Sequence, residues 1–294
     1  KGAPGIHHNM KNIYPIKKIL LTAMIALIVM VNPVEAKYGK NKVQYRGMDW
    51  SFIQTPHFDV YFYEGGESIA EFAANVAEKS YDQISYQLDW RLSKRIAILV
   101  YNSHNDFQQT NVTLGYLQEG IGGFTELFKN RVVLPFEGSY EQFRHVLHHE
   151  LTHAVVNDLI FGGNVQSIVS GKMRVNIPLW LSEGYAEYSS LDWDSRADMI
   201  IRDAAINGSL PPIQYLNYYM AYKGGQSVVR YIGETFGVER IGEILHETRH
   251  FKDVPKAIEN TLHLDLETLT EKWHFSVRKD YWPDIEGRSN LDDV

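Results

Sequence analysis

The stretch FRHVLHHELTHAVVNDL, residues 143–159, holds four histidines and one glutamate within nine residues. Its centre is HELTH, in which His149, Glu150 and His153 have a spacing that suits a helix. Residues four apart lie on one face of a helix, so the two histidines can bind one metal ion side by side. Glu150 follows the first histidine directly and can take a proton from a water that the metal activates. We therefore predict a zinc site with His149 and His153 as ligands and Glu150 as general base.

Two further histidines of this stretch compete for the role of ligand. His145 lies four residues before His149 and on the same helix face, but no glutamate follows it in the position of a base. His148 points about 100° away around the helix. We expect neither to bind the metal, and we expect His145 to lie at the rim of the site.

The third ligand is expected in PLWLSEGYAEYSS, residues 178–190. A catalytic zinc ion takes three protein ligands and keeps one open position. Pro178 fits the first turn of a helix, and Glu183 and Glu187 lie four apart on one face of that mostly apolar helix. Two carboxylates there repel each other unless a positive charge lies beside them. We predict that Glu183 binds zinc and that Glu187 accepts the outer N–H of a ligating histidine.

The remaining pattern divides the chain into a mixed half and a helical half. Alternating or apolar runs at 57–65, 95–102 and 130–136 predict strands, and apolar residues spaced three and four apart predict a helix over 67–88. Pro135 indicates a strand at a sheet edge, because proline donates no ladder hydrogen bond. From Ser139 onward the pattern predicts helices at roughly 140–158, 178–190, 194–206, 218–236, 238–249, 254–262 and 266–280.

The fold class that follows is α+β. We expect a small mixed sheet with helices in an N-terminal lobe (roughly 45–160), a mostly helical C-terminal lobe (161–283), and the active-site helix between them. Residues 284–294 are polar and patternless, which indicates a linker or a cut end.

The N-terminal residues resemble a targeting signal. After Met10, three lysines precede an apolar run of thirteen residues, Ile19–Val31, which is shorter than the ~20 residues of a membrane span. Small residues at Val34 and Ala36 suit a cleavage site. We expect residues 1–36 to be upstream residues and a signal peptide, the protein to be exported (periplasmic or secreted), and no membrane span beyond that segment.

Composition excludes several classes of function. The net charge of −7 and the sequence pI of about 5.9 argue against a nucleic-acid partner, which usually needs a basic face. The chain has no cysteine, so it has no disulfide, no thiolate zinc site and no cysteine nucleophile.

HELTH followed by WLSEGYAEY resembles the gluzincin metallopeptidases, the peptidase MA-like group with a zincin-like fold. HELTHAV is similar to the thermolysin form of the motif, and WLSEGYAEY to the aminopeptidase N-like form. The resemblance spans roughly residues 45–283. It implies zinc bound by His149, His153 and Glu183, and Glu150 as the base in hydrolysis of a peptide or protein substrate.

Three further expectations come from the same resemblance. Tyr222-Lys223-Gly224 is similar to the aminopeptidase N-like Y-x-K-G segment but one residue shorter, which makes Tyr222 the candidate for oxyanion stabilisation, with Tyr218 and Tyr219 as rivals. The segment GIGGFTELFKNRVVLPF, before the zinc helix, corresponds to an edge strand that pairs with extended substrate in gluzincins. Exported bacterial proteins with such a domain often continue into a C-terminal β-propeller.

The function expected from these residues is an exported zinc metallopeptidase. The alternative is a non-catalytic zincin-fold interaction module of a larger envelope protein. Glu150 favours the enzyme, since a structural zinc site needs no base beside its ligand.

Overall fold

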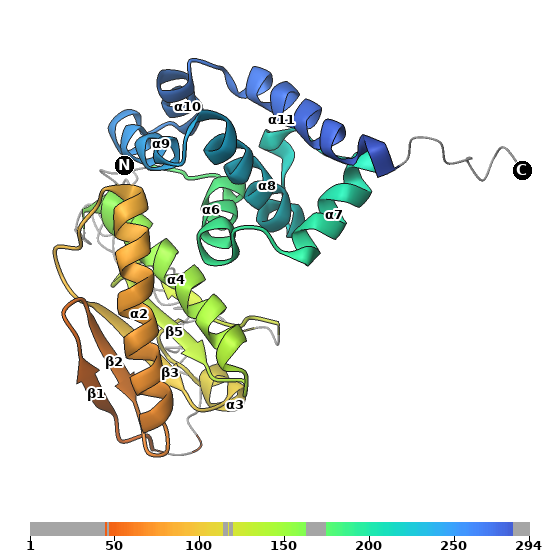
Figure 1. Cartoon of the computed structure of the whole chain (residues 1–294). Coiled ribbons are helices and arrows are strands. Elements are labelled where there is room, and N and C mark those ends of the chain that lie inside the picture. Colours follow the sequence, from red (N-terminus) through yellow and green to blue (C-terminus); the bar gives the residue numbers. More distant parts are fainter. Residues whose placement is uncertain (1–44, 46, 114–116, 118–119, 163–174, 285–294) are drawn as a thin grey trace, which may run out of the picture. The chain divides into compact units, whose positions relative to one another are not determined.

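A five-stranded mixed sheet forms the first half of the chain in the computed structural model (Figure 1). Its strand order is β1-β2-β3-β5-β4. The central strands β2, β3 and β5 run parallel, and β1 and β4 pair antiparallel at the two edges. The strands are β1 (Ser51–Gln54), β2 (Phe58–Phe62), β3 (Ile96–Tyr101), β4 (Phe124–Glu126) and β5 (Arg131–Pro135).

The structure describes residues 45, 47–113, 117, 120–162 and 175–284. All of them belong to one of the two compact units into which the chain divides, Lys42–Val294. The expected signal peptide, part of the loop after Gly162, and nearly all of the polar C-terminal segment lie outside the described residues. Among the described helices, none combines the length and the hydrophobicity that a membrane span requires.

Helices α2 (Glu67–Leu88) and α4 (Tyr140–Phe161) pack against each other and on one face of the sheet (Figure 1). Alternation along the strands explains this layer, because Val60, Ile98 and Val132 are fully buried beneath the helices. The short helix α3 (His104–Gln108) contributes Phe107 to a smaller core with Tyr101 and Val133 on the opposite face.

The second half of the chain is helical. Its first helix, α6 (Leu179–Leu191), packs on both α4 and α8 (Tyr219–Phe236) and so joins the helical half to the helix that carries the predicted histidines. The aspartates directly before α7, α10 and α11 accept hydrogen bonds from first-turn N–H groups of these helices, and these caps explain where the three helices begin. The remaining elements are α7 (Ser195–Ile206), η2 (Ile213–Tyr215), α9 (Glu239–Phe251), α10 (Val254–Leu262), α11 (Leu266–Tyr281) and η3 (Trp282–Asp284).

The predicted α+β class is confirmed, and two details of the sequence prediction are wrong. Strand β5, which contains Pro135, is not an edge strand, because β3 and β4 flank it. Pro135 is its last residue and lies beyond the part of β5 that β4 pairs, so its missing N–H breaks no ladder on that side. Pro178 precedes helix α6 as its cap and does not occupy the first turn.

Candidate metal centre

Helix α4 places the predicted histidines and glutamate in the interior of the fold. Its N-terminus is fixed by Ser139, whose side chain accepts a hydrogen bond from the N–H of Gln142. His149 and Glu150 are only 7% and 8% exposed, although both are polar. Burial of such groups is unfavourable unless each finds a partner. The surroundings of these two side chains therefore indicate what the site is built to hold.

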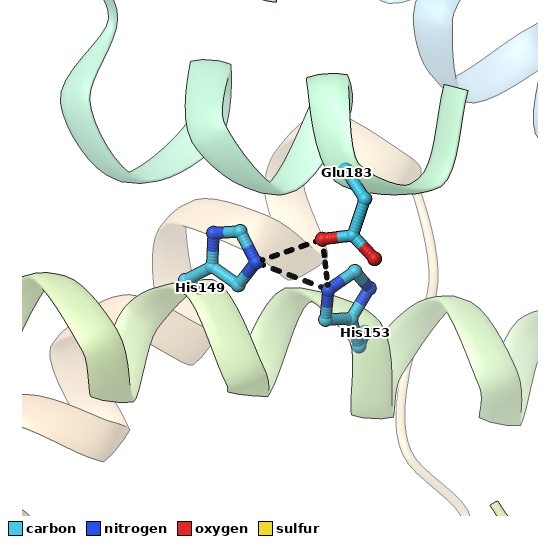
Figure 2. Close-up of side chains that lie close together, drawn as sticks. All are labelled: His149, His153 and Glu183. Atoms are coloured by element: carbon cyan, nitrogen blue, oxygen red, sulfur yellow. Dashed lines mark hydrogen bonds and ion pairs between the residues drawn. The ribbon is translucent and has the colours of Figure 1, made fainter. Parts of the chain in front are cut away.

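Three side chains converge between α4 and α6, as Figure 2 shows. The Nε2 atoms of His149 and His153 lie 3.1 Å apart, and Glu183 Oε2 lies 3.2 Å from each of them. Zinc with ligand bonds of 2.0–2.2 Å in tetrahedral geometry separates neighbouring ligand atoms by roughly 3.3 Å. The spacing of the three atoms thus fits a zinc ion, and two imidazoles with a carboxylate are ligands that zinc prefers.

The protonation of His149 explains why a cation suits this position. Its Nδ1 lies 3.1 Å from Glu187 Oε1, and an ionised carboxylate only accepts hydrogen bonds, so Nδ1 carries the proton. In the neutral ring, Nε2 then presents a lone pair to His153 and to the Glu183 carboxylate. Three electron-rich atoms meet there, and only a proton or a metal ion between them removes the repulsion.

The electrostatics of the metal-free residues lead to the same conclusion. Burial alone would lower the pKa of His149, but hydrogen bonds to Glu183 and Glu187 and the charge of Glu150 raise this pKa to about 10. Burial alone would raise the pKa of Glu183, but hydrogen bonds from His149 and His153 hold it well below its usual value. The site therefore favours positive charge at the point where the three ligand atoms meet.

Strand β4 contacts the predicted base. The hydroxyl of Thr125 lies 2.7 Å from Glu150 Oε2 and 2.8 Å from the Glu150 backbone carbonyl oxygen. This contact orients the carboxylate from the edge of the sheet. Thr125 was not among the predicted site residues, because the resemblance relates the segment 120–136 to a substrate-pairing strand without singling out any of its side chains.

Of the three candidate tyrosines, Tyr222 lies at the site. Its ring is nearly parallel to that of His149, at 14° with centroids 6.2 Å apart, whereas the Tyr218 side chain is 90% exposed. Burial, together with the negative charges of Glu183 and Glu150, raises the pKa of Tyr222 to about 12. Its hydroxyl therefore keeps its proton at neutral pH and can act as a hydrogen-bond donor.

A close crossing of α6 and α8 brings Tyr222 and its neighbours to the site. Gly184 of α6 meets Gly225 of α8, and a Cβ added at either position would overlap backbone atoms of the other helix. Two residues without side chains allow this approach. As a result, α8 presents Tyr222 and Lys223 to the face of α6 that carries Glu183 and Glu187.

Lys223, like Thr125, was not among the predicted site residues. It is 5% exposed, and its Nζ donates to Glu187 Oε2 at 2.6 Å, to Asp194 Oδ2 at 2.8 Å and to Gln226 Oε1 at 3.2 Å. Burial would raise the pKa of Glu187, but the hydrogen bonds from His149 and Lys223 lower it to about 2. A single lysine among small and apolar residues of α8 was the available signal.

The other two histidines lie outside the cluster of three. His148 Nε2 is 2.9 Å from the hydroxyl of Ser189, and burial lowers the pKa of His148 to about 4, so this ring is neutral at pH 7. His145 Nε2 lies 3.8 Å from Glu187 Oε1, near the outer carboxylate and away from the three converging atoms. Neither histidine is part of the group of three ligand atoms that converge.

The α+β architecture, a small mixed sheet followed by a mostly helical half, is consistent with a zincin-like fold. Residues 76–279, well over half of the chain, match the model of the Peptidase MA superfamily, and the chain belongs to this superfamily. The resemblance seen in the sequence is thereby confirmed at the superfamily level. No curated protein matches the chain.

Proposed function

We propose that this protein is an exported, zinc-dependent metallopeptidase that hydrolyses peptide bonds. One observation carries the proposal: His149, His153 and Glu183 bring three ligand atoms within 4.8 Å of one another, with Glu150 next to the first ligand on the same helix. Membership of the Peptidase MA superfamily supports the same class of activity. Export is proposed on the signal-like residues 10–36 alone.

His149, His153 and Glu183 would hold the ion, which when bound supplies a Lewis acid for the scissile carbonyl and for the attacking water. Glu150, oriented by Thr125, takes the proton of that water and delivers it to the leaving amine. The hydroxyl of Tyr222 donates a hydrogen bond to the oxyanion that develops on the substrate.

The substrate of this proposal is an extended peptide segment. Among the residues that the structure describes, strand β4 pairs with β5 and with no other strand, and its other side is the edge of the described sheet next to the site. Such an edge binds extended backbone by adding a strand. The segment 120–136, which the resemblance relates to a substrate-pairing edge strand, contains β4, whereas Pro135 lies in the inner strand β5.

The test compares the protein with its Glu150→Gln variant. Bound metal is determined by mass spectrometry, and cleavage of an unfolded protein substrate is followed for both. We expect one zinc per chain in both proteins and cleavage only by the parent, because the amide of glutamine cannot act as the base.

Two other results would change the proposal. Zinc in both proteins without cleavage in either would favour the alternative, a non-catalytic zincin-fold interaction module of a larger envelope protein. Absence of zinc from both would overturn the ligand assignment itself.

A further inference from the structure

The outer side of the His149 ring leads into a chain of charged groups that spans three helices. His149 Nδ1 on α4 contacts Glu187 Oε1 on α6 at 3.1 Å, and Glu187 Oε2 accepts from Lys223 Nζ on α8 at 2.6 Å. Each oxygen of the Glu187 carboxylate therefore has its own partner. The side chains of Glu187 and Lys223 are 8% and 7% exposed, so solvent screens their interaction weakly.

We propose that Lys223 is a positioning residue for zinc binding, acting through Glu187 on His149. This inference rests on the proposed function. With Oε2 held by the ammonium, the carboxylate cannot rotate away, and Oε1 stays in line with Nδ1–H. The imidazole is then held with Nε2 toward His153 and Glu183. Partners of this outer kind typically change metal affinity by roughly 10- to 100-fold.

The contacts of Asp194, the cap residue of α7, argue against the alternative that Lys223 serves only to neutralise the charge of Asp194. Asp194 also accepts from Lys223 Nζ, at 2.8 Å, but its other oxygen accepts from the N–H groups of Arg196 and Ala197 at the start of α7. It therefore has partners without the lysine. Glu187 is the member of the network that touches a candidate ligand.

The sign of the effect distinguishes positioning from simple electrostatics. An ammonium near a dication repels it, so the loss of Lys223 acting only through space would tighten zinc binding. Loss of a positioning contact would weaken it. Zinc affinity alone, without any measurement of catalysis, thus separates the two explanations.

The experiment is a double-mutant cycle on zinc affinity, measured by competition with a chelator. The proteins are the wild type, Lys223→Met, Glu187→Gln and the double variant, with folding checked by circular dichroism. We expect Lys223→Met to weaken zinc binding about 10- to 100-fold in the wild-type background and by less than about threefold in the Glu187→Gln background. Lys272→Met, which removes an exposed lysine of α11 outside this network, is the matched control and is expected to stay within about threefold of the wild type.

Several results would overturn the inference. Tighter or unchanged zinc binding by Lys223→Met refutes positioning, and an equal loss in both backgrounds assigns the lysine a role independent of Glu187. If Lys223→Met does not fold, the double variant decides, because it buries no unpaired Glu187 charge. A zinc affinity of the double variant equal to that of Glu187→Gln supports the inference. A lower zinc affinity than that of Glu187→Gln refutes it. If the wild type binds no zinc, the proposed function is refuted. If the wild type and Lys223→Met bind zinc equally well, only this inference is refuted.

Discussion

The two edges of the His149 imidazole face different surroundings, although each meets a carboxylate from the same helix. Glu183 and Glu187 are one turn apart on α6, with Glu183 at Nε2 and Glu187 at Nδ1. Behind Glu187 lies the ammonium of Lys223. In the described part of the chain, the ion pairs of Glu183 involve only the two histidines.

This difference shows that the partner of a buried carboxylate decides its role. On the Nδ1 side a lysine supplies the positive charge, and the result is a closed ion-pair network. On the Nε2 side the proposed function leaves that charge to a metal ion, for which His149, His153 and Glu183 would be the ligands. Both carboxylates are glutamates of α6, so their different ion-pair partners distinguish them: Lys223 of α8 for Glu187, and the two histidines for Glu183.

The strongest test of this contrast is the Glu183→Gln variant. We expect its zinc affinity to fall by more than the roughly 100-fold upper range for an outer partner, because a charged ligand is lost. Competition with a chromogenic chelator measures the change. Glu141→Gln, an exposed glutamate in the first turn of α4, is the matched control and should bind zinc like the wild type. Wild-type affinity in Glu183→Gln would contradict the assignment.

The Tyr222→Phe variant tests the tyrosine that lies over the face of the His149 ring. Loss of one oxyanion donor should lower kcat by about 100-fold, with zinc affinity unchanged. Tyr218→Phe removes an exposed hydroxyl and should leave kcat as it was. Steady-state kinetics on a peptide substrate would separate the two, and equal kcat values in both variants would remove Tyr222 from the proposed mechanism.

The Glu187→Gln variant tests the carboxylate at Nδ1 of His149. The amide can still accept a hydrogen bond from His149 but loses the charge that pairs with Lys223. We expect zinc affinity to fall by roughly 10- to 100-fold, less than for Glu183→Gln. The same chelator competition gives the ranking of the two variants, and a reversed ranking would invert the proposed roles of the two carboxylates.

The close crossing of α6 and α8 is tested by protein stability, not by zinc affinity or kcat. Gly184→Ala places a Cβ against the backbone of Gly225, and overpacking of this kind costs about 1–3 kcal/mol. Denaturant unfolding of the metal-free protein measures the change in the free energy of unfolding. Gly120→Ala has open space around its added Cβ and should change that free energy little. Equal stability of the two variants would show that α6 and α8 tolerate a wider crossing.

Much of this architecture follows from local pattern. The helix predicted at 67–88 coincides with α2, because its apolar spacing is regular over six turns. The candidate ligands His149 and His153 are four residues apart on α4, and helix geometry alone brings them together. These features need no information from distant parts of the chain.

The parts that the sequence missed depend on distant partners. Strands β1 and β4 are four and three residues long, too short for alternation to define them, and exist through pairing with β2 and β5. Lys223 meets Asp194 and Glu187 across 29 and 36 sequence positions. Only the crossing of α6 and α8 shows that these charges form one network.

The most direct test of the central claim is the position of zinc itself in crystals of the zinc-loaded protein. Anomalous scattering at the zinc edge should give one peak about 2.0–2.2 Å from His149 Nε2, His153 Nε2 and a Glu183 oxygen, with no fourth protein ligand. A peak elsewhere, or a fourth side chain that closes the coordination sphere, would contradict the account.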